Sequence, residues 1–394
     1  MTKKMNDRTL LAHAAVNPSE HHGFINPALY RGSTVAFPTV AALAGRTQPY
    51  RYGRWGNPTS TALCEAINAL EGGAVGTVLC PSGLTACTTA ILAVCGAGDH
   101  LLVPDSVYGP VRHFCDTAAR RMNIETTYYD PRIGAGIAGL FHPNTRAVFL
   151  ESPGSGTFEV QDVPAIAAVA HERDIFVLMD NSWATPLFLK PLELGVDLSI
   201  MAATKYIGGH SDVMLGTIAC GPRAWEQVRD MHFQVGQYVG PDDVTLVLRG
   251  LRTLDVRLQR HQESALTIAH WLEQRPEVSR VFYPALPSHP DHALWQRDFR
   301  GASGLLSFVT RSPSSDFVAA MIDGLKLFTI GYSWGGFESL ALPVDPRSLR
   351  TATQWTETGH LIRLHIGLED VDDLMADLEE GFSRLRAVEA QKNL

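Results

Sequence analysis

Two residues of opposite charge, Asp180 and Lys205, each follow a strongly apolar segment of the chain. The segments FVLMD and LSIMAAT are typical of buried strands, and the 25 positions between the two residues leave room for one strand–crossover–strand unit. In open α/β sheets, the carboxyl ends of the strands form the ligand site. We therefore expect the two side chains to converge at one sheet edge, although an ordinary structural or surface ion pair would show the same spacing.

Pyridoxal phosphate chemistry requires a buried lysine and a buried acid. The lysine forms a Schiff base with the aldehyde, and its amine has to be desolvated so that its pKa falls from about 10.4. The acid pairs with the pyridinium nitrogen and keeps it protonated, which lets the ring accept electrons. A phosphate could bind at Ser82-Gly83-Leu84, which opens a helix after a strand, and Thr204 adds a hydroxyl. A plain helix cap by Ser82 remains an alternative.

Two further segments carry groups suited to an amino acid's carboxylate. Arg363 lies within the apolar segment LIRLHIG, where a guanidinium needs a carboxylate partner. Ser333 and Trp334 lie in the glycine-containing segment YSWGG. Near the N-terminus, the segment YRYGR at 50–54 supplies phenols and arginines for a phosphate, unless it is a solvated basic loop. Each feature alone is more often structural, but together they fit a pyridoxal phosphate site.

Other motifs fit their apparent chemistry poorly. The GxGxxG at 134–139 is followed almost at once by Pro143, whereas a dinucleotide site needs a full helix after the glycines. The segment GHSDV lacks the final glycine of a hydrolase elbow. The segment HPDH at 289–292 has no further ligands at metal spacing, so we predict no metal site.

Composition excludes several classes of protein. With 394 residues, 45% hydrophobic and 19% charged, the chain can build a large core and is not disordered. Its net charge of −8 argues against nucleic-acid binding. No apolar stretch reaches the roughly 20 residues of a membrane span, and the N-terminus lacks a secretory signal pattern. The six cysteines form no CxxC pair, so we expect reduced thiols and a cytoplasmic protein.

The chain divides into three parts. Five prolines about ten positions apart in residues 1–60 leave no room for a helix to run through, which predicts an extended arm that reaches across another surface. Residues 61–250 alternate short apolar runs with helical patterns, which predicts a mostly parallel sheet covered on both faces. A long helix follows, and residues 251–394 show the α+β pattern of a smaller C-terminal domain.

These residues and motifs resemble the cysteine/methionine-metabolism family of pyridoxal-phosphate enzymes over about residues 26–385. The matching segments include ALEGG, PSG, ESPGS, DNSWATP, AATKY, GHSD, RGLRTL, YSWGGFESL and IRLHIGLEDVDDL. The resemblance implies the aspartate aminotransferase fold, type I, with pyridoxal 5'-phosphate as cofactor. It also implies a homo-oligomer, a tetramer built as a dimer of dimers, with sites shared between subunits.

The resemblance also implies roles for individual residues. Lys205, Tyr108 and Asp180 would be catalytic. The cofactor would be bound by Tyr52 and Arg54 of a neighbouring subunit and by Gly83, Leu84, Tyr108, Asp180, Thr204 and Lys205. The substrate would be bound by Tyr332, Ser333, Trp334, Arg363 and Ser155.

Several positions bear on the reaction that the resemblance implies. Ser155 and Tyr332 resemble the branch that cleaves Cβ–S bonds, with cystathionine as expected substrate and homocysteine, pyruvate and ammonia as products. The segment RWGNPT resembles the general family instead. Ala202 stands where relatives often carry serine, and His113 stands where the most similar ones carry an acid. γ-Elimination or γ-replacement remains the main alternative, and a non-catalytic regulatory protein on this fold is a remote one.

Overall fold

A seven-stranded sheet forms the centre of the computed structural model, which describes residues 5–392. Its strands lie in the order β1-β7-β6-β5-β4-β2-β3, and all neighbours are parallel except those that involve β7. The strands are β1 (Gly76–Cys80), β2 (His100–Pro104), β3 (Glu125–Tyr129), β4 (Thr145–Glu151), β5 (Phe176–Asp180), β6 (Leu198–Ala202) and β7 (Gly216–Cys220). The predicted mostly parallel α/β fold is confirmed, but the antiparallel strand β7 was not foreseen.

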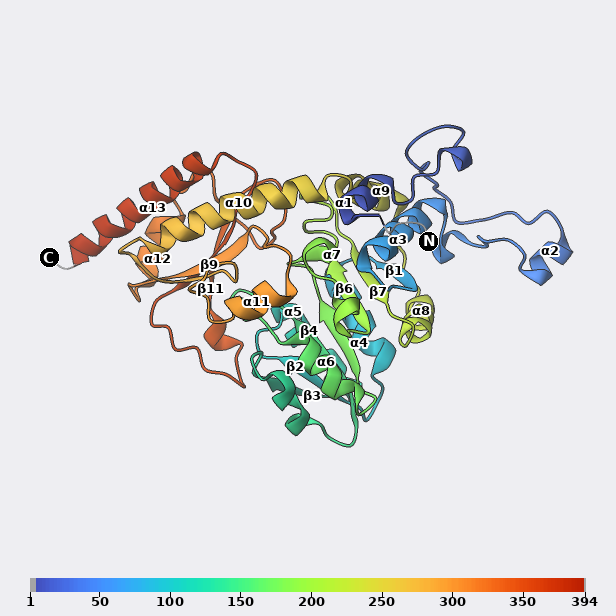
Figure 1. The fold of residues 1–394 in the computed structure, drawn as a ribbon, viewed down its shortest axis with the longest axis horizontal. Coiled ribbons are helices and arrows are strands. Elements are labelled where there is room, and N and C mark those ends of the chain that lie inside the picture. The colour runs from blue at the N-terminus through green and yellow to red at the C-terminus, as the bar shows by residue number, and fades with distance from the viewer. Residues whose placement is uncertain (1–4, 393–394) are drawn as a thin grey trace.

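Helices cover both faces of this sheet (Figure 1). Successive side chains of β2 point to opposite faces, so Leu102 joins one apolar core while Leu101 and Val103 join the other. The helices of this lobe are α3 (Pro58–Glu71), α4 (Gly83–Val94), α5 (Gly109–Phe114), α6 (Val163–His171), α7 (Thr185–Phe188), α8 (Trp225–Gln234) and α9 (Pro241–Leu251). The GxGxxG forms only a short 3-10 turn, Gly134–Leu140.

Local signals explain where the helices next to the site begin and end. In α3, Asn57 and Ser60 form a reciprocal capping box, Pro58 occupies the first turn, and Gly72 ends the helix with a φ of 64°. In α4, the Ser82 hydroxyl accepts the N–H of Thr85 at 3.1 Å. The helix predicted after β2 is present and runs to Arg121, but it widens into a π-helical turn at Cys115–Ala119.

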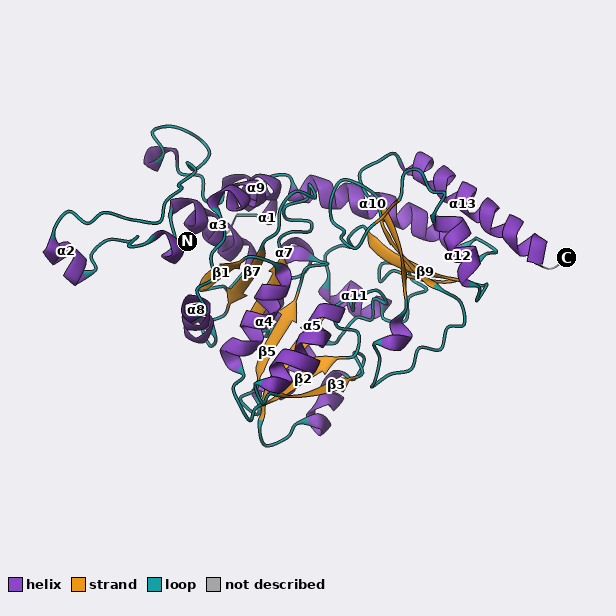
Figure 2. Cartoon of the chain, turned by 180° about the vertical axis from the view of Figure 1, so that it is seen from behind, coloured by secondary structure: helices purple, strands orange, loops and turns teal. Residues whose placement is uncertain are grey.

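A second, five-stranded sheet builds the C-terminal lobe in the order β10-β11-β12-β9-β8. Helix α10 (Leu254–Glu273) runs from the first lobe to the second along one side of the molecule (Figures 1 and 2). The remaining elements are β8 (Val278–Phe282), α11 (His292–Asp298), β9 (Leu305–Thr310), α12 (Ser315–Ile322), β10 (Thr329–Ile330), β11 (Leu340–Val344), β12 (Leu361–His365) and α13 (Val371–Lys392).

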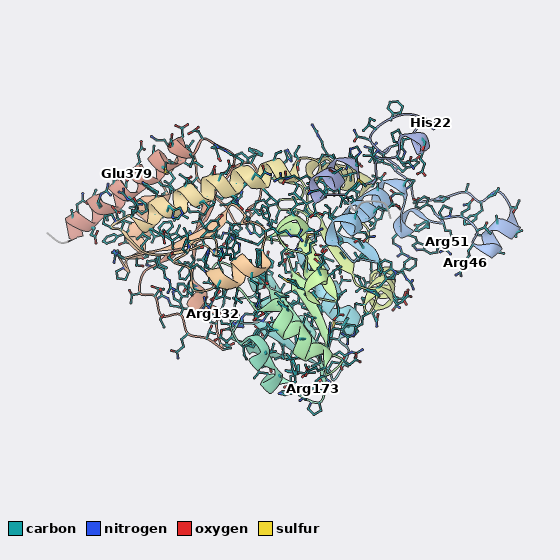
Figure 3. The ribbon with its side chains drawn as sticks, in the orientation of Figure 1. His22, Arg46, Arg51, Arg132, Arg173 and Glu379 are labelled. Carbon is teal, nitrogen blue, oxygen red and sulfur yellow. The ribbon has the colours of Figure 1, made fainter. Side chains whose placement is uncertain are left out.

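The N-terminal region is less extended than its prolines predicted. Helix α1 (Asp7–His13) ends before the first proline and packs on α3 and α10, with Leu11 buried in the main core. A short helix, α2 (Val40–Gly45), fits between two prolines at the tip of a projection that leaves the body (Figure 1). Figure 3 shows Arg46 and Arg51 on this projection, at the end of the molecule away from Glu379.

Candidate active site

A cavity of about 340 Å³ opens where β4, β5 and β6 end and α4 begins. Its walls include most of the residues singled out from the sequence. These are Gly83, Leu84, Tyr108, Ser155, Asp180, Thr204, Lys205, Tyr332, Trp334 and Arg363. Ser333 also reaches the site, because its hydroxyl accepts a hydrogen bond from the Lys205 amine at 2.8 Å. The expected convergence of Asp180 and Lys205 at one sheet edge is therefore observed.

Lys205 follows β6 and carries the only amine among the residues that line this cavity in the described chain. Its Nζ lies 5.3 Å from the centre of the Trp334 ring. Burial, together with the positive charge of Arg363, lowers the pKa of Lys205 to about 8, although Asp180 acts in the opposite direction. A substantial fraction of the amine is therefore neutral, and nucleophilic, at mildly alkaline pH.

Asp180 is the last residue of β5, and its carboxylate contacts nearby groups of the same chain. One carboxylate oxygen accepts the backbone N–H of Ser182 at 2.9 Å, and the Cys87 thiol lies 3.7 Å from the other. Burial raises the pKa of Asp180, while the bonds from Ser182 and the charge of Lys205 act against this rise. A cationic ring nitrogen beside the carboxylate would stabilise its ionised form, as pairing of opposite charges does in a buried site.

The N-terminus of α4 forms an anion cradle. The first N–H groups of a helix have no intrahelical partner, and Ser82 caps only that of Thr85. Gly83 lies so close to β6 that a Cβ there would stand 2.5 Å from the Ala202 side chain, so the close approach requires glycine. The N-terminus of α4, the buried Asp180 carboxylate and the Lys205 amine line one cavity, and this set of groups fits pyridoxal phosphate.

Arg363 faces the same cavity from β12 of the C-terminal lobe. Its guanidinium donates to the carbonyl oxygens of Tyr332 at 2.7 Å and Ser333 at 3.1 Å. Burial lowers its pKa to about 10. The carboxylate partner predicted for Arg363 is not supplied by residues 5–392, where it forms no ion pair, so its remaining N–H groups can serve a substrate carboxylate.

Tyr108 and Ser155 are held by backbone contacts on neighbouring turns. The N–H of Tyr108 donates to a Glu151 carboxylate oxygen at 2.6 Å, and the N–H of Ser155 donates to the carbonyl of Ser106 at 2.8 Å. Thr204 lines the cavity, but its hydroxyl is already bonded to the backbone of Leu215.

Several residues that line the cavity were not singled out from the sequence, among them Glu151, Ser182 and Cys87. Glu151 ends β4 as Asp180 ends β5, and this shared position after an apolar strand was the signal that could have identified it. Burial, and then the charge of Asp180, raise the pKa of Glu151 well above its usual range. The Ser182 hydroxyl accepts a hydrogen bond from the backbone N–H of Ala202 at 2.7 Å. The sequence around Cys87 indicated only a helix and did not indicate that this residue lines the cavity.

Tyr52 and Arg54 do not reach this cavity within one chain. Tyr52 is exposed, and Arg54 donates to the Phe233 carbonyl in a separate cleft of about 800 Å³. His113 is exposed on α5 and does not line the cavity. Over the described residues, no three His, Cys, Asp or Glu side chains are grouped to bind a metal ion. None of the helices within residues 5–392 is long and apolar enough to cross a membrane.

Comparison with known proteins identifies the family of the chain. The family model "Cys/Met metabolism PLP-dependent enzyme" matches residues 8–383. Cystathionine beta-lyase MetC of Escherichia coli is 44% identical over 96% of this chain and 98% of its own, and cystathionine beta-lyase of Haemophilus influenzae is 42% identical over 98% and 100%. A crystal structure of cystathionine gamma synthase from Xanthomonas oryzae superposes with a TM-score of 0.89 at 33% identity over 97% and 99%. The chain belongs to the Cys/Met metabolism family of PLP-dependent enzymes.

Proposed function

We propose that this enzyme is a carbon–sulfur lyase that uses pyridoxal 5'-phosphate to cleave the Cβ–S bond of cystathionine or a related cysteine thioether. One observation carries the proposal: a desolvated Lys205 amine, a buried Asp180 and an Arg363 guanidinium line the same cavity. The β-lyase names of relatives at 42–44% identity favour cystathionine as the substrate. The products are homocysteine, pyruvate and ammonia.

When bound, pyridoxal phosphate supplies an electron sink for the charge that develops at the substrate Cα. Gly83 and Leu84 would hold its phosphate with helix N–H groups, and Asp180 would keep its ring nitrogen protonated. Arg363 and Ser333 would orient the substrate carboxylate, with Tyr332, Trp334 and Ser155 on the substrate side, and Tyr108 would contact the cofactor ring. These assignments are supported by the positions of the residues around the cavity.

Lys205 moves the proton. Its neutral Nζ removes the proton from Cα, and the electron pair left there forms the new double bond to Cβ as the Cβ–S pair leaves with sulfur. The same Nζ then returns a proton to the thiolate. The enamine that remains hydrolyses to pyruvate and ammonia. The Ser333 hydroxyl accepts a hydrogen bond from Nζ at 2.8 Å and so limits the movement of the amine.

Product analysis tests the reaction. Holoenzyme incubated with cystathionine is expected to release pyruvate and homocysteine in equal amounts. Release of 2-oxobutyrate and cysteine would contradict the proposal and establish γ-elimination, which occurs in the same family. A panel of cystathionine, cystine, cysteine and S-substituted cysteines, each assayed for pyruvate, then defines the thioether range.

The lowered pKa of Lys205 predicts a pH dependence of cofactor uptake. Below pH 8 the amine of the apoprotein is mostly protonated, so its neutral fraction falls about tenfold per pH unit. The rate at which apoprotein develops visible absorbance with added pyridoxal phosphate is therefore expected to rise with pH and level off above about 8. A stopped-flow series from pH 7 to 9.5 measures this, and a rate that still rises about tenfold per pH unit at the upper end of the series would show that burial does not activate the amine.

Tyr52 and Arg54 support an assembly larger than one chain. Both lie outside their own cavity, and the projection that precedes them in the chain carries exposed apolar residues such as Val40 and Leu43. We infer that they serve the cofactor phosphate of a neighbouring copy, in a cytoplasmic homotetramer built as a dimer of dimers. Light scattering of the holoenzyme measures the assembly.

A further inference from the structure

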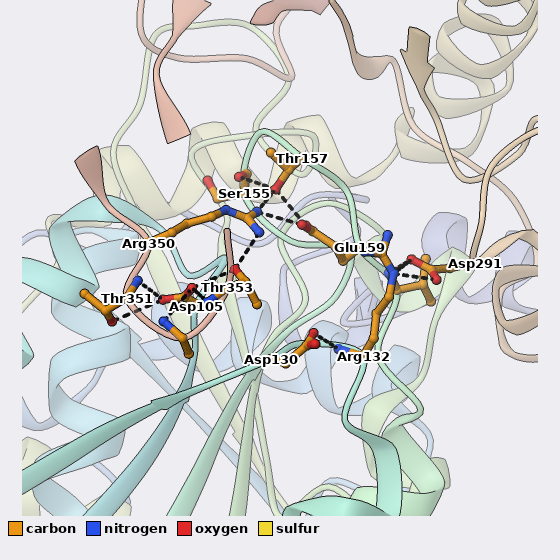
Figure 4. Close-up of polar contacts among 12 residues, drawn as sticks. Asp105, Asp130, Arg132, Ser155, Thr157, Glu159, Asp291, Arg350, Thr351 and Thr353 are labelled. Carbon is orange, nitrogen blue, oxygen red and sulfur yellow. Dashed lines mark hydrogen bonds and ion pairs between the residues drawn. The ribbon is translucent and has the colours of Figure 1, made fainter. Parts of the chain in front are cut away.

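The segment 345–358 joins β11 to β12 with no helix or strand apart from a single 3-10 turn, Pro346–Ser348. Polar contacts nevertheless fasten it to the first lobe (Figure 4). The side chains that make these contacts form one connected group, which we call the latch. The latch comprises Asp105, Thr157, Glu159, Arg350 and Thr353.

Asp105 forms one end of the latch and holds the middle of the segment. It follows β2, and its carboxylate accepts the backbone N–H groups of Thr351 at 2.9 Å, Ala352 at 3.0 Å and Thr353 at 2.7 Å. The Thr353 hydroxyl donates a further bond at 2.7 Å. Arg112 pairs with the same carboxylate at 2.6 Å, and both of these side chains are buried. So many donors on one buried carboxylate leave the segment a single position.

Arg350 anchors the other end. Its guanidinium donates to the Glu159 carboxylate and to the Thr157 hydroxyl, each at 2.6 Å. Only 7% of the Arg350 side chain and 5% of the Glu159 side chain are exposed, so the pair is shielded from water. Arg350 also donates to the Thr353 hydroxyl at 3.0 Å. Thr353 therefore joins the two ends, since it donates to Asp105 and accepts from Arg350.

Both anchor points lie on turns that build the active-site cavity. Asp105 is three residues before Tyr108, and Thr157 and Glu159 follow Ser155 on the turn after β4. A small cavity of about 70 Å³ lies under the segment and is lined by Leu349 and Arg350. This small cavity shares Ser155, Gly156 and Arg363 with the main one. The segment thus forms an outer wall behind the substrate side of the site.

From this geometry, and resting on the proposed function, we propose that Arg350 and Thr353 are positioning residues for the substrate. They fix the turns that carry Tyr108 and Ser155 relative to the lobe that carries Arg363. Because the substrate has to contact both lobes, a shift of one lobe weakens its binding.

A nearly isosteric substitution tests this role. Thr353→Val removes the hydroxyl that bridges the two ends of the latch, and Thr356→Val is the matched control because Thr356 is exposed on the same segment. Thr353→Val is expected to raise KM for the thioether about tenfold, as loss of a charge-assisted bond would, with kcat within about twofold. Thr356→Val is expected to leave both constants unchanged. An unchanged KM, or a fall in kcat alone, would overturn the proposal.

Arg350→Met tests the same role at the charged end, with Arg347→Met as its control, since Arg347 is exposed and forms its ion pair with the neighbouring Asp345. Glycine binding to the holoenzyme, measured by the change in visible absorbance, gives a readout that needs no lyase activity. Thr353→Val is expected to weaken glycine binding about tenfold and to speed chymotryptic cleavage at Leu349. Faster cleavage with unchanged glycine binding would mean that the latch is only structural. If the wild-type holoenzyme released no pyruvate, that result would contradict the proposed function but not the role of the latch.

Discussion

Replacing Lys205 by alanine is expected to abolish turnover and the visible absorbance of bound pyridoxal phosphate together. The substitution removes both the amine that bonds to the cofactor and the base that moves the Cα proton. No other amine lines the cavity among the residues described. Loss of a residue that acts as nucleophile and base lowers kcat by about 10³-fold or more. The measurement is pyruvate release combined with a visible spectrum of the dialysed protein.

Lys326→Ala is the matched control for this substitution. Lys326 is exposed on the C-terminal lobe and pairs with Glu380, so its loss is expected to leave the spectrum and the turnover unchanged. Near-normal pyruvate release by the Lys205→Ala enzyme would refute the mechanism. Retained absorbance after dialysis would show that another group bonds to the cofactor.

Asp180→Asn has the second largest expected effect. The amide oxygen can still accept the N–H of Ser182, so the turn keeps its shape, but the negative charge is gone. A buried charge left without its partner costs about 3–5 kcal/mol, which corresponds to a fall of about 10²–10⁴-fold in kcat/KM. Steady-state assays with saturating cofactor separate this loss from weaker cofactor binding.

The control is Asp243→Asn, which changes an exposed carboxylate in the first turn of α9. Its kcat/KM is expected to stay within about twofold of the unmodified enzyme, because surface substitutions have small effects. A fall of less than about tenfold in the Asp180→Asn enzyme would show that the ring nitrogen does not depend on this charge.

Most strands of the central sheet could be predicted because each is a short apolar run bounded by a turn. The segment GTIAC of β7 has the same length and composition, but it lies between a glycine-containing loop and another turn, with no crossover helix before it. Strand β11 contains Pro343 and was not foreseen either. Position along the sequence does not reveal an antiparallel insertion, because strand pairing depends on contacts between distant segments.

A site residue could be predicted from the sequence where a chemically suitable side chain stands at or shortly after the end of a predicted strand. Asp180 ends β5, and Gly83 and Lys205 stand three residues after β1 and β6, so topology brings them to one sheet edge. Arg350 and Glu159 gave no such signal, because they are remote in sequence and sit in segments with no regular pattern. Their pairing depends on how the two lobes dock, which neither periodicity nor residue type encodes.

The antiparallel strand β7 has a consequence for the order of folding. Gly76 of β1 pairs with Cys220 of β7 across about 140 intervening residues, and a pairing this remote closes slowly because the chain between its ends has to be ordered first. The turn from β1 into α4, where the cofactor phosphate is expected to bind, therefore docks late. A nascent chain that ends before β7 lacks a finished cradle, so cofactor capture follows closure of the whole sheet.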